Sequence, residues 1–373
     1  TYVQGYPYNG EEIPFDSYEP YIYGKLTWQP GAKDKIYFSY NYSDLVYNHR
    51  GAGDTQVESS TYKQDGVNHA FNFDWSHTFS NNFFGSLKFA SAPVNFAMRT
   101  KNGNAYMEDY LTSNALPGSS AGYASIYERG HLQFQTDFTL FIDDFMGQHE
   151  WKVGGDLNVS SGRRHLDFEG PESSLMSGYQ AYYVYYWDGD PFYAYFYQDN
   201  LSKEKMQNLS AYIQDTWTVS RNLTLTLGVR YSNSRGIIPA QNEDAGGYFL
   251  PQYFGDAYPL ANTAVTDQFT AVTWNSLSPR LAFSYDLAAD GKTVIKGSYG
   301  RYYEALLTQY FSTVNPNGYA GFWGYVDNNM DLYYLDGINT PEAGILGYNG
   351  KEPKAPYEDE FTVSLERELF QDW

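Results

Sequence analysis

One stretch, residues 209–231, restricts the fold of this chain more than any other part of the sequence. In its second half, apolar residues alternate strictly with threonine, glycine and arginine. Alternation of this kind is the pattern of a β-strand with one apolar and one polar side. About three residues, 220–222, separate this half from the one before it, so the two are predicted to pair as an antiparallel hairpin. The apolar side carries Leu223, Leu225, Leu227, Val229 and Tyr231.

The same unit recurs along the chain and predicts about eleven strands. Tight turns at one end alternate with loops of about sixteen to fifty residues at the other, at about 49–64, 99–122, 167–203, 239–269 and 307–356. Residues 1–17 read as the tail of a further loop. Besides the hairpin at 209–231, the strands are expected at about 18–29, 35–48, 66–79, 83–98, 123–142, 149–166, 270–287, 291–306 and 357–370.

This spacing predicts an all-β, transmembrane antiparallel β-barrel. Aromatic residues make up 19% of the chain, yet no run approaches the ~18 apolar residues of a spanning helix. Ordinary domains rarely hold several structureless connections longer than ~12–15 residues, whereas outer-membrane barrels combine short periplasmic turns with long extracellular loops. The alternative is a soluble sheet protein with an aromatic core. The positions of Trp28, Trp75, Trp151, Trp217 and Trp373 beside short turns favour an aromatic girdle at the periplasmic side of a membrane.

Eleven is an odd number, whereas bacterial single-chain barrels have even strand numbers. A sheet left open here would also expose two unpaired edges in hydrocarbon, which lipid does not tolerate. Residues 1–373 are therefore expected to be one β-barrel segment of a longer protein. Its remaining strands and its signal peptide are expected to lie outside this sequence.

Three segments resemble TonB-dependent outer-membrane receptors, and in combination their Oar-like branch. The resemblance implies a barrel of about 22 strands that is plugged by an N-terminal domain. It further implies import of a scarce ligand, driven by a TonB-type energising protein that acts on the plug. The three segments are LSAYIQDTWTVSRNLTLTLGVRYS (209–232), NSLSPRLAFSYDLAADGKTVIKGSYGRYYE (275–304) and PYEDEFTVSLERELFQDW (356–373).

Several chemistries find no support in the sequence. The net charge of −20 argues against nucleic acid as a partner, and the absence of cysteine excludes thiol chemistry. The six histidines form no metal-ligand spacing, and no nucleophile motif or cofactor motif is present, so we expect neither an enzyme nor a cofactor. Asp327, Asn329 and Asp331 match the first half of a calcium loop, but Leu332 replaces the required glycine. We therefore expect a polar loop and no metal.

The loop at about 167–203 is the candidate ligand-binding segment, because tyrosine and tryptophan offer large rigid faces with a polar handle. The alternative is that these rings only extend the strands and pack over the barrel rim. The candidate residues are Tyr182, Tyr183, Tyr185, Tyr186, Trp187, Phe192, Tyr193 and Tyr195.

Polar strand residues are expected to face the lumen, because a charge facing lipid at mid-bilayer costs about 2–4 kcal/mol. Contact with a plug is the expected role of Gln133, Gln135, Asp137, Arg230, Arg280, Arg301 and Glu304. The resulting hypothesis is a transporter of the bacterial outer membrane, surrounded by outer-membrane lipid. The alternatives are a surface binding or assembly protein anchored by the barrel, and an open porin. The sequence does not determine the imported ligand.

Overall fold

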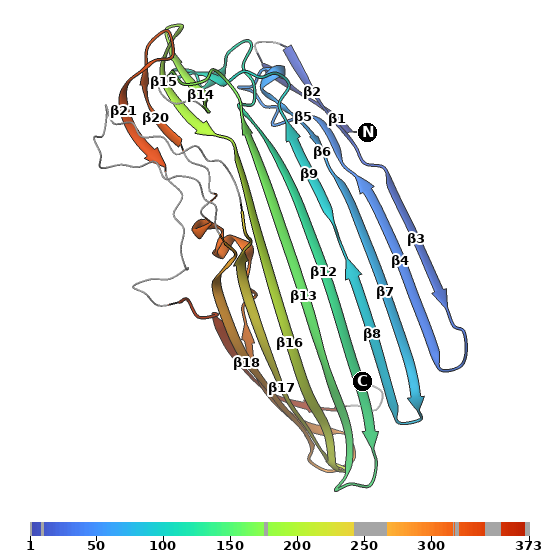
Figure 1. The fold of residues 1–373 in the computed structure, drawn as a ribbon. Helices are drawn as coiled ribbons and strands as arrows, with labels where there is room; N and C mark the ends of the chain where they lie inside the picture. The colour runs from blue at the N-terminus through green and yellow to red at the C-terminus, as the bar shows by residue number, and fades with distance from the viewer. Residues whose placement is uncertain are drawn as a thin grey trace.

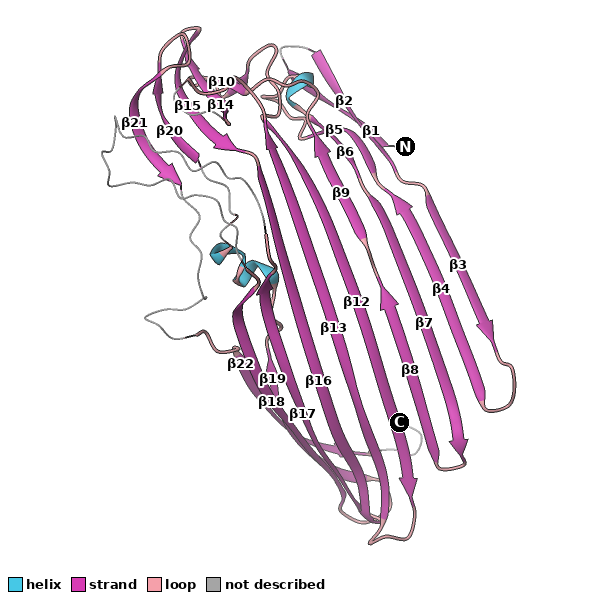
Figure 2. Ribbon diagram, viewed as in Figure 1, coloured by secondary structure: helices cyan, strands magenta, loops and turns pink. Residues whose placement is uncertain are grey.

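The protein is described by a computed structural model that covers residues 2–8, 11–174, 178–241, 267–315, 317, 321–339 and 352–369. These residues form two antiparallel sheets, one long and one short, with a single parallel pair in the short one. Among the described residues, the helical elements are three 3-10 turns, at Glu58–Ser60, Thr308–Tyr310 and Ser312–Val314 (Figure 2). Within the ranges given, no helix has both the length and the apolar character needed to cross a membrane.

Long antiparallel strands lie side by side in the main sheet, and tight turns join them at one end (Figure 1). β8 and β9 both pair with β12, as two pieces of one interrupted strand. Counted in this way, eleven long strands are found where the sequence predicts them. They are β3 (Tyr21–Trp28), β4 (Asp34–Asp44), β7 (Val67–Ser80), β8 (Phe83–Ser91), β9 (Val94–Arg99), β12 (Tyr123–Ile142), β13 (Gln148–Phe168), β16 (Asn200–Ser220), β17 (Leu223–Ile238), β18 (Phe269–Asp286), β19 (Thr293–Tyr303) and β22 (Tyr357–Arg367).

The two faces of the main sheet differ in polarity, as the alternation predicts. One row of paired residues across β12, β13, β16 and β17 reads Phe138, Val153, Ile213 and Val229. All four side chains are between 38% and 46% exposed, so no other described part of the chain covers them. We name this side the apolar face and the opposite side, which carries Arg230, the polar face.

Four of the tryptophans stand where the sequence analysis places them. Trp28 and Trp75 both pair with Ile36 of β4, close to the tight turns. Trp151 and Trp217 lie near the turn ends of β13 and β16, on the apolar face. Trp373 lies outside the described residues.

The prediction that the long connections lack regular structure is wrong. β1 (Tyr2–Tyr8), β2 (Glu11–Tyr18), β5 (Val46–Arg50) and β6 (Tyr62–Asp65) add to the main sheet. β10 (Tyr106–Asp109), β11 (Asn114–Ala115), β14 (Tyr179–Trp187), β15 (Asp190–Gln198), β20 (Gly321–Val326) and β21 (Leu332–Asn339) form a second sheet at the long-loop end (Figure 1). In β14, β15, β20 and β21 both faces carry aromatic residues, so the polar-apolar contrast that reveals a strand is missing from the sequence.

The buried cores lie at the long-loop end of the molecule. One packs under the second sheet around Tyr179, Phe196 and Phe322, which are at most 1% exposed. Another packs Ile238 and Phe311 at the ends of β17 and β18. The tight-turn end is therefore a single layer, and the second sheet rests on a core of its own.

Candidate functional site

The second sheet sorts its side chains by alternation into a buried side and a ring-bearing side. In β15, Ala194 and Phe196 are fully buried, whereas the intervening Tyr193 and Tyr195 remain half-buried. Tyr195 pairs with Tyr183 of β14 on one side and with Trp323 of β20 on the other. The buried side belongs to the core described above, so the opposite side is open for contact.

The ring-bearing side forms a continuous aromatic surface across four strands. Ring centroids lie 4.8 Å apart for Tyr106 and Tyr183, and 5.9 Å apart for Tyr195 and Trp323. Separations of 4.5–7 Å are typical of favourable aromatic pairs. We name this surface the tyrosine platform; it consists of Tyr106, Tyr183, Tyr185, Tyr193, Tyr195, Trp323 and Tyr325.

Two carboxylates accept hydrogen bonds from tyrosine hydroxyls of the platform. Tyr183 donates to Glu108, and Tyr193 donates to Asp336 over 2.6 Å. Burial, followed by these hydrogen bonds, raises the pKa of both phenols above the ordinary value. The hydroxyls therefore stay protonated at neutral pH, and the platform combines aromatic faces with negative charge at its rim.

The structure divides the predicted ligand-binding residues among four places. Tyr183, Tyr185, Tyr193 and Tyr195 lie on the platform. Tyr182 packs against Phe168 and Tyr197. Tyr186 reaches the buried core, where its hydroxyl lies 3.7 Å from the sulfur of Met107. Trp187 and Phe192 contact Tyr110 at the tip of the β14–β15 hairpin.

Sequence reasoning missed the platform residues that come from distant parts of the chain. Tyr106 pairs with Tyr183 across a parallel contact, and Tyr325 pairs with Tyr193. The sequence contained one signal for these residues. Trp323 and Tyr325 are two residues apart, which is the spacing that places two rings on the same side of a strand.

Several predicted lumen residues lie on the polar face of the main sheet. Gln135 of β12 pairs with Lys88 of β8 on one side and with Asp156 of β13 on the other. Arg230 pairs with Asp156, whose other oxygen accepts from Asn158 over 2.8 Å. Ser86 donates to Asp137 in the same way. On this face, charges from strands far apart in sequence neutralise one another.

Gln133 and Arg280 also lie on the polar face. Gln133 lies two residues from Gln135 in β12, so both side chains are on the same face. Arg280 pairs with Gly228 of β17, which lies two residues from Arg230 and therefore on the same face as Arg230.

The register contradicts the predicted position of Arg301. In β19, Tyr299 pairs with Leu281 and Phe361 of the apolar face, and Arg301 follows two residues later on the same side. There it makes two hydrogen bonds of 2.8 Å to Asp359. Tyrosines on both sides of β19 hide the polar-apolar contrast, so its faces could not be told apart from sequence.

Glu304 follows the last residue of β19. Its backbone N–H donates to the carbonyl of Pro356 over 2.9 Å, and its carboxylate accepts from Tyr310. This residue therefore belongs to the long-loop end and not to the wall of the sheet.

The half calcium pattern forms the turn between β20 and β21. The carboxylate of Asp327 accepts from the backbone N–H groups of Asn329 and Asp331, each over 2.9 Å. In the part of the chain that is described, no three histidine or carboxylate side chains are grouped as metal ligands.

Residues 14–373 match the family model described as the outer membrane beta barrel domain. The chain belongs to this family. The protein is therefore located in the bacterial outer membrane. No curated protein matched the chain in a sequence comparison.

Two solved structures show the same fold. The siderophore receptor PiuA from Acinetobacter baumannii is 12% identical, with a TM-score of 0.50 over 95% of this chain and 48% of the receptor. The outer membrane transporter YddB from Escherichia coli is 14% identical, with a TM-score of 0.53 over 86% of this chain and 39% of the transporter. The chain thus spans less than half the length of each.

Proposed function

We propose that the chain forms part of the barrel wall of a TonB-dependent, Oar-like transporter that captures a scarce ligand on the tyrosine platform. Its role is binding and passage, not catalysis. The observation that carries this proposal is the position of the platform, at the long-loop end of an outer-membrane sheet. In barrels of this kind the long loops face the outside of the cell, where a ligand would first arrive.

The chemistry of the platform suits a ligand with a flat or apolar side. Seven rings from four strands offer a wide rigid contact area, and few torsions must be frozen on binding. The two solved structures of the same fold are a siderophore receptor and an outer membrane transporter. Siderophores, cobalamin, glycans and peptides all remain candidate ligands for this chain.

The polar face supplies the proposed contact with a plug. Arg230, Asp156 and Asn158 offer hydrogen-bonding groups inside the proposed barrel, where they would meet the plug domain. Residues 1–373 are one barrel segment in this proposal, and about 22 strands close the barrel. A TonB-type protein would act on the plug with energy from the proton gradient.

Uptake in whole cells tests the transport step. Cells that express the full-length protein are given labelled ferric siderophores, cobalamin, oligosaccharides and peptides, with and without a protonophore. We expect one ligand class to enter, and its uptake to stop when the gradient is dissipated. Uptake that continues without the gradient would refute energised transport and favour an open porin.

Substitution of the central ring tests the platform. Tyr195 contacts Tyr183, Tyr185, Tyr193 and Trp323, so Tyr195→Ala removes the middle of the surface. We expect at least a tenfold loss of affinity, equal to about 1.4 kcal/mol. Tyr195→Phe should keep most of the binding because it retains the ring.

Tyr18→Ala serves as the matched control, because this tyrosine is 64% exposed and belongs to the main sheet. Equal affinities for Tyr195→Ala and Tyr18→Ala would exclude the platform as the capture surface.

The alternative function is surface adhesion by the same platform, with the barrel as an anchor. Tyr333 and Tyr334 favour it, because they lie in the outer strand of the second sheet and are 63% and 57% exposed. An adhesin would bind its partner without any uptake in the assay above.

A further inference from the structure

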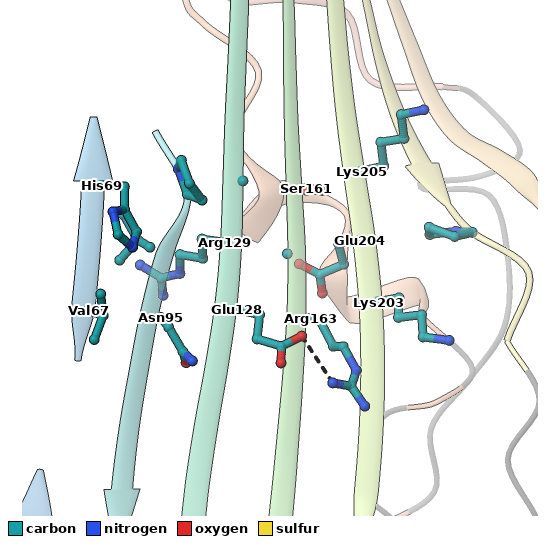
Figure 3. A pocket seen from close by; sticks show the side chains of 15 residues that line it. Val67, His69, Asn95, Glu128, Arg129, Ser161, Arg163, Lys203, Glu204 and Lys205 are labelled. Carbon is teal, nitrogen blue, oxygen red and sulfur yellow. Dashed lines mark hydrogen bonds and ion pairs between the residues drawn. The ribbon is translucent and has the colours of Figure 1, made fainter. Parts of the chain in front are cut away.

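Four basic residues gather on the apolar face of the main sheet, beyond the last apolar side chains. In β16 this face runs from Ile213 and Leu209 through Gln207 to two lysines. Arg163 of β13 is directly opposite Lys203, the second of these lysines (Figure 3). Arg235 of β17 is directly opposite Gln207. We name the group the basic ledge; it consists of Arg163, Lys203, Lys205 and Arg235.

The near edge of the ledge, at Lys205, lies close to the headgroup layer of a membrane. Lys205 lies four residues beyond Leu209, which is about 13 Å along a strand and about 10 Å along the normal if the strand tilts by about 40°. The polar layer of a bilayer extends about 5–8 Å beyond the hydrocarbon on each side. Flexible lysine and arginine side chains can bridge the difference.

The ledge carries unbalanced positive charge in a chain whose net charge is −20. Arg163 makes an ion pair with Glu128 over 3.0 Å. Among the described residues, no carboxylate lies within ion-pair distance of Lys203, Lys205 or Arg235. Arg163 directly opposite Lys203 is a like-charge pair, which destabilises a sheet unless an anion lies between the two.

A hollow of about 610 Å³ lies beside these side chains. Asn95, Glu128, Arg163, Lys203 and Lys205 are among its lining residues (Figure 3). The hollow offers amide and cationic donors together, and it has room for more than a bare phosphate.

We propose that the basic ledge binds the phosphate-bearing headgroup of an outer-leaflet lipid. The acyl chains of that lipid lie along the apolar face below, next to Leu209 and Leu132, which are 60% and 41% exposed. A free anion would pair with the cations but leave the neighbouring apolar side chains without a partner. The lipid satisfies both parts of the surface at once, since phosphate pairs with lysine and arginine and the chains pack on leucine. This inference does not depend on ligand uptake.

Thermal unfolding of the intact protein in detergent tests the proposal. The micelles contain a diphosphorylated glycolipid, the same lipid without its phosphates, or inorganic phosphate alone. We expect the diphosphorylated lipid to raise the unfolding temperature of the wild type by several degrees. The double variant Lys203→Gln/Lys205→Gln should bind this lipid at least tenfold more weakly.

Two further variants separate binding from folding. Lys25→Gln/Lys35→Gln removes two lysines from the polar face near Tyr37 and should behave like the wild type. Lys203→Arg keeps the charge and should keep the binding. Without lipid, Lys203→Gln/Lys205→Gln should unfold at the same temperature as the wild type or above it, because the like-charge contact is relieved.

Three results would overturn the proposal. If the wild type and the lysine double variant bound the diphosphorylated lipid equally well, the basic ledge would not be the binding site for this lipid. Full stabilisation by the dephosphorylated lipid would assign the effect to the acyl chains alone. Full stabilisation by inorganic phosphate would make the ledge a site for a free anion and not for a lipid.

Discussion

The assignment of the two faces can be tested by placing the same arginine on each side of one strand. Leu281 and Ala282 are neighbours in β18. Leu281 pairs with Leu227 and Tyr299 on the apolar face and is 44% exposed. Ala282 pairs with Thr226 and Ser298 on the polar face. The two positions therefore share a depth in the membrane and differ only in the environment that they face.

The depth of Leu281 sets the expected magnitude. It lies four residues from both Tyr285 and Leu277, the ends of the apolar series in this strand. Four residues span about 13 Å, or about 10 Å along the membrane normal after a tilt of about 40°. Leu281 is thus near the centre of an apolar band about 25 Å tall, where an arginine costs about 2–4 kcal/mol.

Denaturant unfolding in phospholipid vesicles, followed by tryptophan fluorescence, measures this cost. Leu281→Arg should lower the free energy of unfolding by about 2–4 kcal/mol. Ala282→Arg should change it by less than about 1 kcal/mol, because its guanidinium can reach water or polar groups. Equal losses for the two variants, or a larger loss for Ala282→Arg, would refute the assignment of the faces.

Three more predictions concern packing, a buried ion pair and a phenol. A Cβ at Gly85 would stand 2.7 Å from the ring of Phe138, so Gly85→Ala should destabilise the protein by about 1–3 kcal/mol in the same unfolding assay, and Phe138→Leu should recover part of the loss. His149 and Asp215 form a 2.7 Å contact, and both side chains are 8% exposed. His149→Phe should lower the free energy of unfolding by about 3–5 kcal/mol, because it leaves the carboxylate of Asp215 buried without a partner. A loss below about 1 kcal/mol would show that this carboxylate does not stay buried and unpaired. Burial raises the pKa of Tyr179 to about 12 from an ordinary value near 10, so its contribution to stability is complete below pH 10 and is lost between pH 10 and 12. Absorbance at 295 nm should count the same number of phenols ionising near pH 10 in the folded wild type and in folded Tyr179→Phe, and one fewer in Tyr179→Phe than in the wild type when both are unfolded in urea.

The sequence alone determined the long strands and the side to which most of their residues point. Alternation between Leu223 and Tyr231 is a local property with a period of two, so it can be read without knowing which strands pair. The tight turns fix which successive strands are antiparallel neighbours. The aromatic loop was also identified as the segment of interest, since its composition differs from the rest of the chain.

Tertiary structure decided what local periodicity does not contain. Tyr106 and Trp323 reach the tyrosine platform only because strands far apart in the sequence pair in one sheet. Arg301 turns to the apolar face because the register with Leu281 and Phe361 fixes its side, whereas its own neighbours are aromatic on both faces. Arg163 and Lys203 likewise meet only through pairing of β13 with β16. In each case the deciding energy is a contact between distant segments, and no residue nearby in the sequence records it.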